Sequence, residues 1–143
     1  MRITVVAVEE NEAVLVAGTS AFGIRGKFGC PLVAGEVIFI AARGFEDNLR
    51  AGSSITVETD YESLSDVSVL SDGDAQTMEP AAQAGDYVIR GRVLSAVDGG
   101  IVRVGVRGFV FDLDSRVIAP LTAEVGQGLR FTVHRLVFWD CNT

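Results

Sequence analysis

The sequence is poor in the residues that carry most catalytic and metal chemistry. Its 143 residues include one histidine (His134), two cysteines (Cys30 and Cys141) and a single lysine (Lys27). One histidine cannot supply a histidine-rich metal cluster, and the two cysteines fit no metal-ligand spacing and no disulfide framework. We therefore expect no metal, no cofactor and two reduced thiols.

Long apolar segments are also missing. The longest apolar run, VIFIAA at 37–42, is far shorter than the about 20 residues that a membrane-spanning helix needs. The start of the chain, MRITVVAVEENEA, has a short apolar run broken by glutamates instead of the apolar stretch and cleavage site of a secretory signal. These features predict no membrane partner and a cytoplasmic location.

Catalytic motifs are absent as well. The glycine-rich stretch GTSAFGIRGKFG at 18–29 lacks the Lys-Ser/Thr pair of a phosphate-binding P-loop. No GxSxG motif marks a nucleophilic serine. His134 has no Cys, Asp or second His in a metal or triad spacing, so it is interpreted as a structural strand residue. We expect no catalytic residues, and hence a protein that is not an enzyme.

What the sequence does contain is β-type patterning. Runs rich in Val, Ile and Phe alternate with period two between glycine-containing turns. Residues 61–70 fit a short helix or a further strand, and residues 78–84 fit one helical turn. The fold class is therefore predicted to be all-β with antiparallel strands and little helix. The predicted strands span 3–8, 12–18, 35–43, 53–60, 86–97, 100–108, 109–114 and 128–140.

The last predicted strand, GLRFTVHRLVFWD, is apolar on both faces. Regular alternation assigns one face to Leu129, Phe131, Val133, Val137 and Trp139, interrupted by Arg135. The same alternation assigns the other face to Arg130, Thr132, His134, Leu136, Phe138 and Asp140. A strand with two apolar faces is covered on both sides. We expect it to pack against the strand at 35–43.

Charge divides the chain into three parts. The net charge is −7. Residues 1–70 hold ten acidic and five basic side chains, residues 71–86 hold four acids and no base, and residues 87–143 hold seven arginines and five acids. A faint repeat relates LRAGSSITVE at 49–58 to VGQGLRFTVH at 125–134. We interpret 1–70 and 87–143 as two small OB-like or barrel-like β units that derive from this degenerate repeat, the first one acidic, and 71–86 as an acidic linker.

The second unit carries a family resemblance. The run GDYVIRGRVLSAVDGGIVRVGVRGFVFDLDS, followed after a break by VGQGLRFTVHRLVFWD, resembles a five-stranded OB-fold barrel. Its order is similar to that of the RNA-binding OB domains of ribosomal proteins. The resemblance covers residues 85–140, and it implies a binding surface across IVRVGVRGFVFDL. The acidic first half and the single lysine depart from that family.

An arginine-rich face follows from the same strands. A hairpin around residues 98–100 places four arginines on one outer face, with two phenylalanines next in line. The face is either a solvated surface balanced by carboxylates or a patch that binds anions or nucleic acid. Its residues are Arg90, Arg92, Arg103, Arg107, Phe109 and Phe111.

Three function classes fit these features. The first is a non-enzymatic module that masks a basic protein, in the manner of bacterial immunity or antitoxin-type inhibitors, with acidic side chains that steer association. The alternative is a single-stranded nucleic-acid binder that uses the arginine face. An enzyme with an unrecognised site is the third, and self-association is left open. The predicted partner contacts of the first class are Glu9, Glu10, Glu12, Glu46 and Asp47.

Overall fold

The computed structural model contains the whole chain and describes residues 1–16, 18–41, 49–71, 76–97, 100–116 and 124–141. All regular structure in this part is β, without a helix, which confirms the predicted fold class. Residues 61–70 belong to a long strand and not to a helix. The strands are β1 (Arg2–Val16), β2 (Thr19–Gly29), β3 (Ala34–Ile40), β4 (Ser54–Leu70), β5 (Thr77–Pro80), β6 (Tyr87–Val97), β7 (Ile101–Val106), β8 (Phe109–Asp114) and β9 (Gly128–Asp140).

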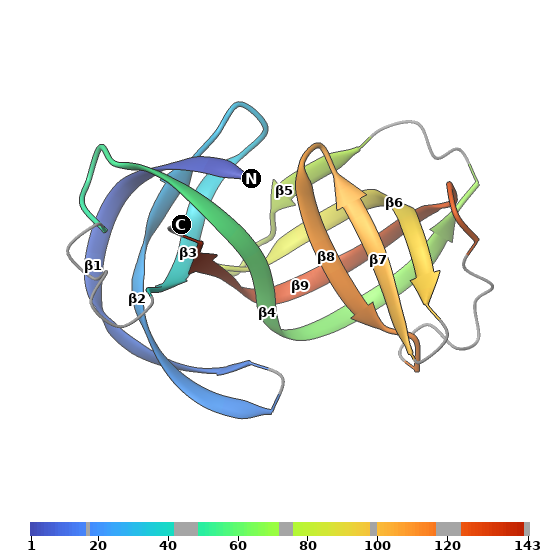
Figure 1. Cartoon of the computed structure of the whole chain (residues 1–143), viewed down its shortest axis with the longest axis horizontal. Coiled ribbons are helices and arrows are strands. Elements are labelled where there is room, and N and C mark those ends of the chain that lie inside the picture. The colour runs from blue at the N-terminus through green and yellow to red at the C-terminus, as the bar shows by residue number, and fades with distance from the viewer. Residues whose placement is uncertain (17, 42–48, 72–75, 98–99, 117–123, 142–143) are drawn as a thin grey trace.

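Five strands form a closed barrel in the order β1-β2-β3-β9-β4, with β4 pairing back to β1 (Figure 1). The neighbours are antiparallel except β3 and β9, which run parallel where Ile38 lies opposite Val137. A small barrel of the OB-like kind is therefore present. The sequence predicted one barrel-like unit in each half, with the OB-fold resemblance at residues 85–140, whereas this ring uses the first four strands and the end of β9.

The other half of the molecule extends the same sheet. The first part of β9 pairs with β6, which is followed by β7 and then β8, while the end of β4 continues along β9 (Figure 1). β4 and β9 thus pass through both halves. Within the stretch interpreted as a linker, residues 77–80 form β5, which pairs with the start of β6.

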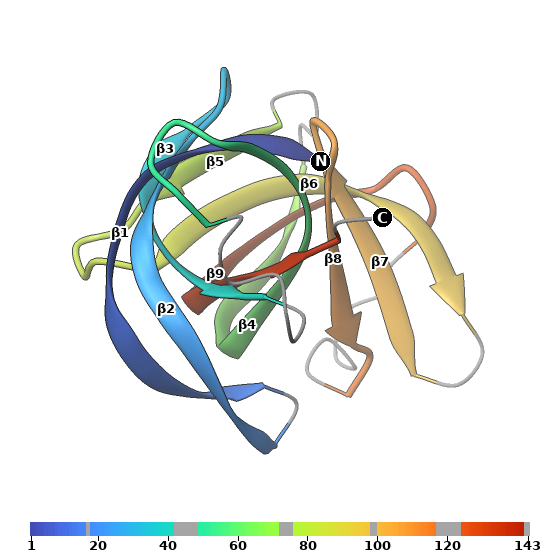
Figure 2. The same ribbon diagram turned by 60° about the vertical axis from the view of Figure 1, so that its left-hand side comes forward.

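The first hairpin is longer than the sequence suggested. Two strands were predicted at 3–8 and 12–18, but β1 is continuous and absorbs the acidic segment between them through two irregularities in its pairing with β2. The two strands of this hairpin curve strongly (Figure 2). The far end of β1 packs against β3 and β9. There Val14 and Val16 form a small second core with Ile38, Ile40 and Val137.

Glycines inside β2 explain why the sequence pattern did not predict this strand. Gly23 and Gly26 lie inside β2 against β3. A Cβ on Gly26 would stand 2.4 Å from the carbonyl oxygen of Ala7 and 2.9 Å from the ring of Phe39. The strand therefore needs residues without side chains, although glycine is otherwise rare in strands.

The two faces of β9 change over at Arg135. This residue has φ 55°, in the left-handed region, which shifts the alternation by one position. As a result Leu136 and Phe138, and not Val137 and Trp139, continue the interior face begun by Phe131 and Val133. The predicted coverage on both sides is present, and β9 does pack against β3. The assignment of residues 136–140 to faces was wrong.

Phe138 connects the two halves through the core. Its ring lies 4.7 Å from Phe28 of β2, 6.3 Å from Phe39 of β3 and 5.8 Å from Phe109 of β8, measured between centroids. Aromatic pairs at these separations add about 0.5–1.5 kcal/mol each beyond the area they bury. The main hydrophobic cluster accordingly contains residues from both halves of the chain.

The glycine requirement of β2 can be tested with two substitutions in one strand. Gly26→Ala should lower the free energy of unfolding by about 1–3 kcal/mol, because the methyl group has to displace backbone atoms. Gly29→Ala is the control, since its Cβ would meet Val6 at an ordinary 3.5 Å. Urea unfolding measures both. Equal effects at the two positions would show that the close approach at Gly26 does not matter.

Candidate functional site

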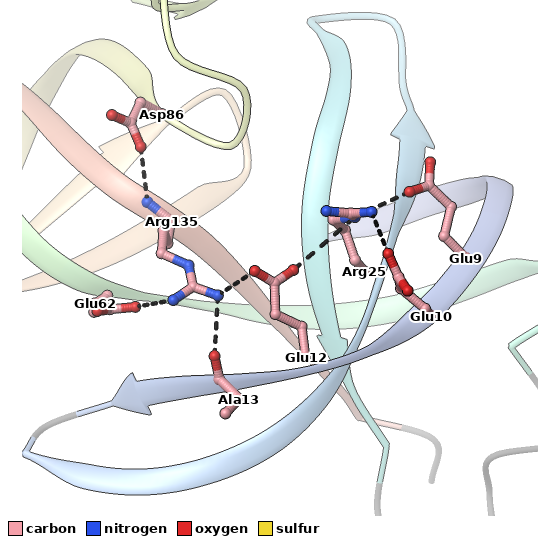
Figure 3. Close-up of polar contacts among 8 residues, drawn as sticks. All are labelled: Glu9, Glu10, Glu12, Ala13, Arg25, Glu62, Asp86 and Arg135. Carbon is pink, nitrogen blue, oxygen red and sulfur yellow. Dashed lines mark hydrogen bonds and ion pairs between the residues drawn. The ribbon is translucent and has the colours of Figure 1, made fainter.

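The acidic residues predicted as partner contacts are largely engaged within the chain (Figure 3). Arg25 of β2 lies 3.0 Å from Glu9 and 2.8 Å from Glu10, and its Nε is 4.0 Å from Glu12. Glu46 and Asp47 lie outside the described residues. The hairpin acids thus balance an arginine of the same hairpin, which reduces the charge they offer to a partner.

Arg135 joins four segments of the chain (Figure 3). Its guanidinium donates to Glu62 of β4 at 2.8 Å and to Glu12 of β1 at 2.8 Å, and also to the carbonyl of Ala13 at 3.0 Å. Its backbone N–H donates to Asp86, just before β6, at 3.1 Å. The side chains of this arginine and its two glutamates are only about one-third exposed. The cluster therefore fixes the curled hairpin to β9.

A Ser-His-Asp chain lies beside this cluster. Asp86 is buried, and its second oxygen lies 2.8 Å from His134 Nδ1, while His134 Nε2 lies 2.6 Å from Ser65 Oγ. This order of atoms is the one that activates a serine nucleophile. Sequence reasoning missed it because Ser65 and Asp86 are 69 and 48 positions from His134.

The surroundings of Ser65 favour a structural role for this chain. The carboxylate of Asp66 lies 3.4 Å from Ser65 Oγ. Acyl transfer requires hydrogen-bond donors where negative charge develops, and a carboxylate at that place opposes it. We interpret His134 as a clamp that ties the irregular part of β4 to β9 and, through Asp86, to β6.

The predicted arginine face is only partly assembled. Arg92 lies opposite Gly105, and its guanidinium donates to the carbonyl of Gly126 at 3.1 Å. Arg103, two residues before Gly105 on β7, lies opposite Ser95 and forms an ion pair of 2.9 Å with Asp112 of β8. Arg107 occupies the β7–β8 turn with φ 44°, and its backbone N–H donates to Gln76. Arg90 is exposed on β6, but its cross-strand neighbour is Arg130, which the sequence reasoning had not included.

Phe109 and Phe111 do not belong to this face. Both side chains are buried in the core, against Phe138 and Phe131 respectively. Their assignment as stacking residues was wrong, because the tight turn before β8 directs odd-numbered residues inward. The exposed residues of β8 are Val110 and Asp112.

The hollowed part of the surface lies along the seam between β4 and β8. β8 ends the strand order, so one of its sides has no backbone partner in the described sheet. Side chains of β4 cover this side: Thr59 donates to the carbonyl of Val110, and Tyr61 donates to that of Asp112 at 2.7 Å. Hollows of about 360 and 550 Å³ lie along the seam, and Asp112 lines both. We call this feature the β4–β8 groove.

The β4–β8 groove is predominantly acidic. Two arginines lie among its carboxylates: Arg103, paired with Asp112, and Arg116, paired with Asp114. Hydrogen bonds from Arg116 lower the pKa of Asp114 to about 2. Burial, reinforced by the nearby carboxylates, raises the pKa of Tyr61 to about 12. The carboxylates that line the groove are Glu58, Asp60, Glu62, Asp112 and Asp114.

Comparisons with known proteins identify no relative: no family model, no curated protein and no solved structure matches this chain. Among the described residues, no group of three or more His, Cys, Asp or Glu side chains is arranged to hold a metal ion. The same part of the chain has no helix with the length and hydropathy needed to cross a membrane.

The role of the clamp can be measured by stability. Asp86→Ala should cost about 1–3 kcal/mol, because it leaves His134 and the backbone N–H of Arg135 without their acceptor. Glu79→Ala, at an exposed position on β5, should change stability by no more than about 0.5 kcal/mol. Chemical unfolding compares the two. If both variants were equally stable, the clamp interpretation would fail.

The raised pKa of Tyr61 predicts a loss of stability in alkali. The unfolded chain ionises its tyrosines near pH 10, whereas folded Tyr61 keeps its proton to about pH 12. The unfolded state therefore binds fewer protons in this window, and stability falls as the pH rises through it. Phenolate absorbance should show no tyrosine step near pH 10 in the native protein, because burial also raises the pKa of Tyr87. Tyr61→Phe should reduce the alkaline loss of stability measured by urea unfolding, and a native ionisation step near pH 10 would contradict this account.

Proposed function

We propose that the protein is a non-enzymatic binding module whose β4–β8 groove receives an extended, basic segment of a partner protein. The observation that carries the proposal is the position of the groove's carboxylates along the unpaired side of an edge strand. The proposal keeps the function expected from the acidic composition but moves the interface from the first hairpin to the groove.

The course of the groove along β8 supports binding of an extended segment. The carbonyls of Val110 and Asp112 point away from β7 and are bonded by side chains of β4, not by a neighbouring strand. Because Thr59 and Tyr61 already bond these carbonyls, an extended segment in the groove would be recognised mainly through its side chains, at alternate positions. Ile101 and Val110, which line the groove, are 47% and 40% exposed and offer apolar contacts beside the acids.

Charge supports a basic partner. The five carboxylates of the groove exceed its three cationic groups, which are two arginines and the α-ammonium of Met1. Arg135, outside the groove lining, pairs with Glu62 alone among these five carboxylates. An excess of negative charge along a groove attracts Lys and Arg side chains and accelerates encounter at low ionic strength. This matches an inhibitor of the immunity or antitoxin type that masks a basic surface.

The nucleic-acid alternative has weaker support. Single-strand binders combine a basic groove with exposed aromatic side chains on which bases stack. The two phenylalanines expected to supply stacking are buried. Arg103, one of the four expected phosphate contacts, is already paired with Asp112.

A displayed library of random peptides tests the groove directly, because it samples many partner sequences at once. Panning on the whole protein should enrich extended peptides with Lys or Arg at alternate positions. The affinity of the enriched peptides should fall roughly tenfold for Glu58→Lys combined with Asp60→Asn, since the two changes together remove the groove's excess negative charge. The asparagine keeps an acceptor for the indole N–H of Trp139.

The matched control is Glu79→Lys, a charge reversal on β5 away from the groove. Its affinity for the same peptides should stay within about twofold of the parent protein. Enrichment of acidic or neutral peptides, or an equal loss in the control, would contradict the proposal.

A further inference from the structure

Two arginines face each other across β6 and β9. Arg90 is the direct cross-strand partner of Arg130, and Thr77 of β5 and Ser68 of β4 complete the row on either side. The residues before and after each arginine are buried, so both guanidinium groups lie on the outer face. We call Thr77, Arg90, Arg130 and Ser68 the arginine row.

The arginine row contrasts with four other arginines of the molecule. Arg25, Arg103, Arg116 and Arg135 each form an ion pair of 3.0 Å or less with a carboxylate. In the described part of the chain, no carboxylate lies within ion-pair distance of Arg90 or Arg130. Like charges directly opposite each other on neighbouring strands destabilise a sheet. An acidic protein thus places two cations directly opposite each other, while it balances these four arginines with carboxylates.

We propose that the arginine row binds a phosphate dianion, either free or as the phosphomonoester of a small molecule. Directly opposed residues have Cβ atoms roughly 5 Å apart, so both guanidinium groups can reach one anion. Two guanidinium groups together carry two positive charges, which neutralise the charge of about −1.5 to −2 on a phosphomonoester near pH 7. A carboxylate neutralises only one of the two groups. The planar guanidinium also matches phosphate oxygens in pairs.

The surroundings of the row favour a small ligand over a polynucleotide. Its flanking residues, Ser68 and Thr77, are uncharged hydroxyls that do not compete for the arginines. Tyr87 and Phe131, the aromatics nearest in sequence to Arg90 and Arg130, are buried and cannot stack on bases. A phosphodiester also carries one charge per group, which leaves the second arginine unbalanced. The site is separate from the β4–β8 groove and does not depend on the function proposed for it.

The test is titration calorimetry of the whole protein with inorganic phosphate, with phenyl phosphate and with a short oligothymidylate, at constant ionic strength. Phosphate and phenyl phosphate should bind saturably, and the affinity should fall roughly tenfold or more for each arginine removed in Arg90→Gln and Arg130→Gln. Arg103→Gln is the matched control, because that guanidinium lies on the same sheet and is already paired with Asp112. It should bind phosphate as the parent does.

A second measurement separates binding from folding. In phosphate-free buffer of low ionic strength, Arg130→Gln should raise the melting temperature, because it removes the repulsion from Arg90. Phosphate should raise the melting temperature of the parent and not that of the double variant. Three results would overturn the proposal: no phosphate binding by the parent, an equal loss in Arg103→Gln, or oligothymidylate binding tighter than phenyl phosphate and abolished by the double variant.

Discussion

The antiparallel ladder between β4 and β9 is the interaction on which both halves of the molecule depend. It runs from Val57 opposite Asp140 to Leu70 opposite Gly128, with one irregularity between Ser65 and Ser68. At one end β9 closes the barrel by pairing with β3, and at the other it supports β6 and the strands beyond. Because one ladder belongs to both halves, a slip in its register would invert the faces of both at once.

That register is held by polar contacts at the irregular positions. His134 bonds Ser65 where β4 departs from regular pairing, and Arg135 adopts a left-handed conformation where β9 changes faces. Asp86 accepts hydrogen bonds from both residues. A left-handed backbone at a non-glycine residue costs free energy and persists only where its surroundings compensate. Here the compensation comes from two glutamates, a backbone carbonyl and a buried aspartate.

Local patterning was sufficient to predict most of the strands but not their partners. Alternation identified the all-β class and the coverage of β9 on both sides, because a buried strand leaves that signal in its own residues. It could not locate the change of faces at Arg135, since nothing in LVFWD reveals a left-handed residue before it. Nor could it find β2, whose glycines look like turns until Gly23 and Gly26 are seen packed against β3. Ser65, Asp86 and His134 meet only through pairings across long sequence separations. The sequence also does not reveal that Arg25 and Arg135 pair with the acids at 9–12, which is why those acids were predicted to contact a partner.

The use of arginine in place of lysine follows from these contacts. Arg135 serves two carboxylates and one carbonyl from a single side chain, and Arg25 bonds two glutamates in different directions. A guanidinium presents several N–H donors in a rigid plane, whereas an ammonium is a compact charge on a flexible stem. Several fixed acceptors around one cation therefore favour arginine over lysine. Arg103 and Arg116 likewise each donate to both carboxylate oxygens of one aspartate. Arg90 and Arg130 have the same donor geometry but no carboxylate acceptor within the described chain. This is the physical reason to expect their acceptor to come from outside the protein.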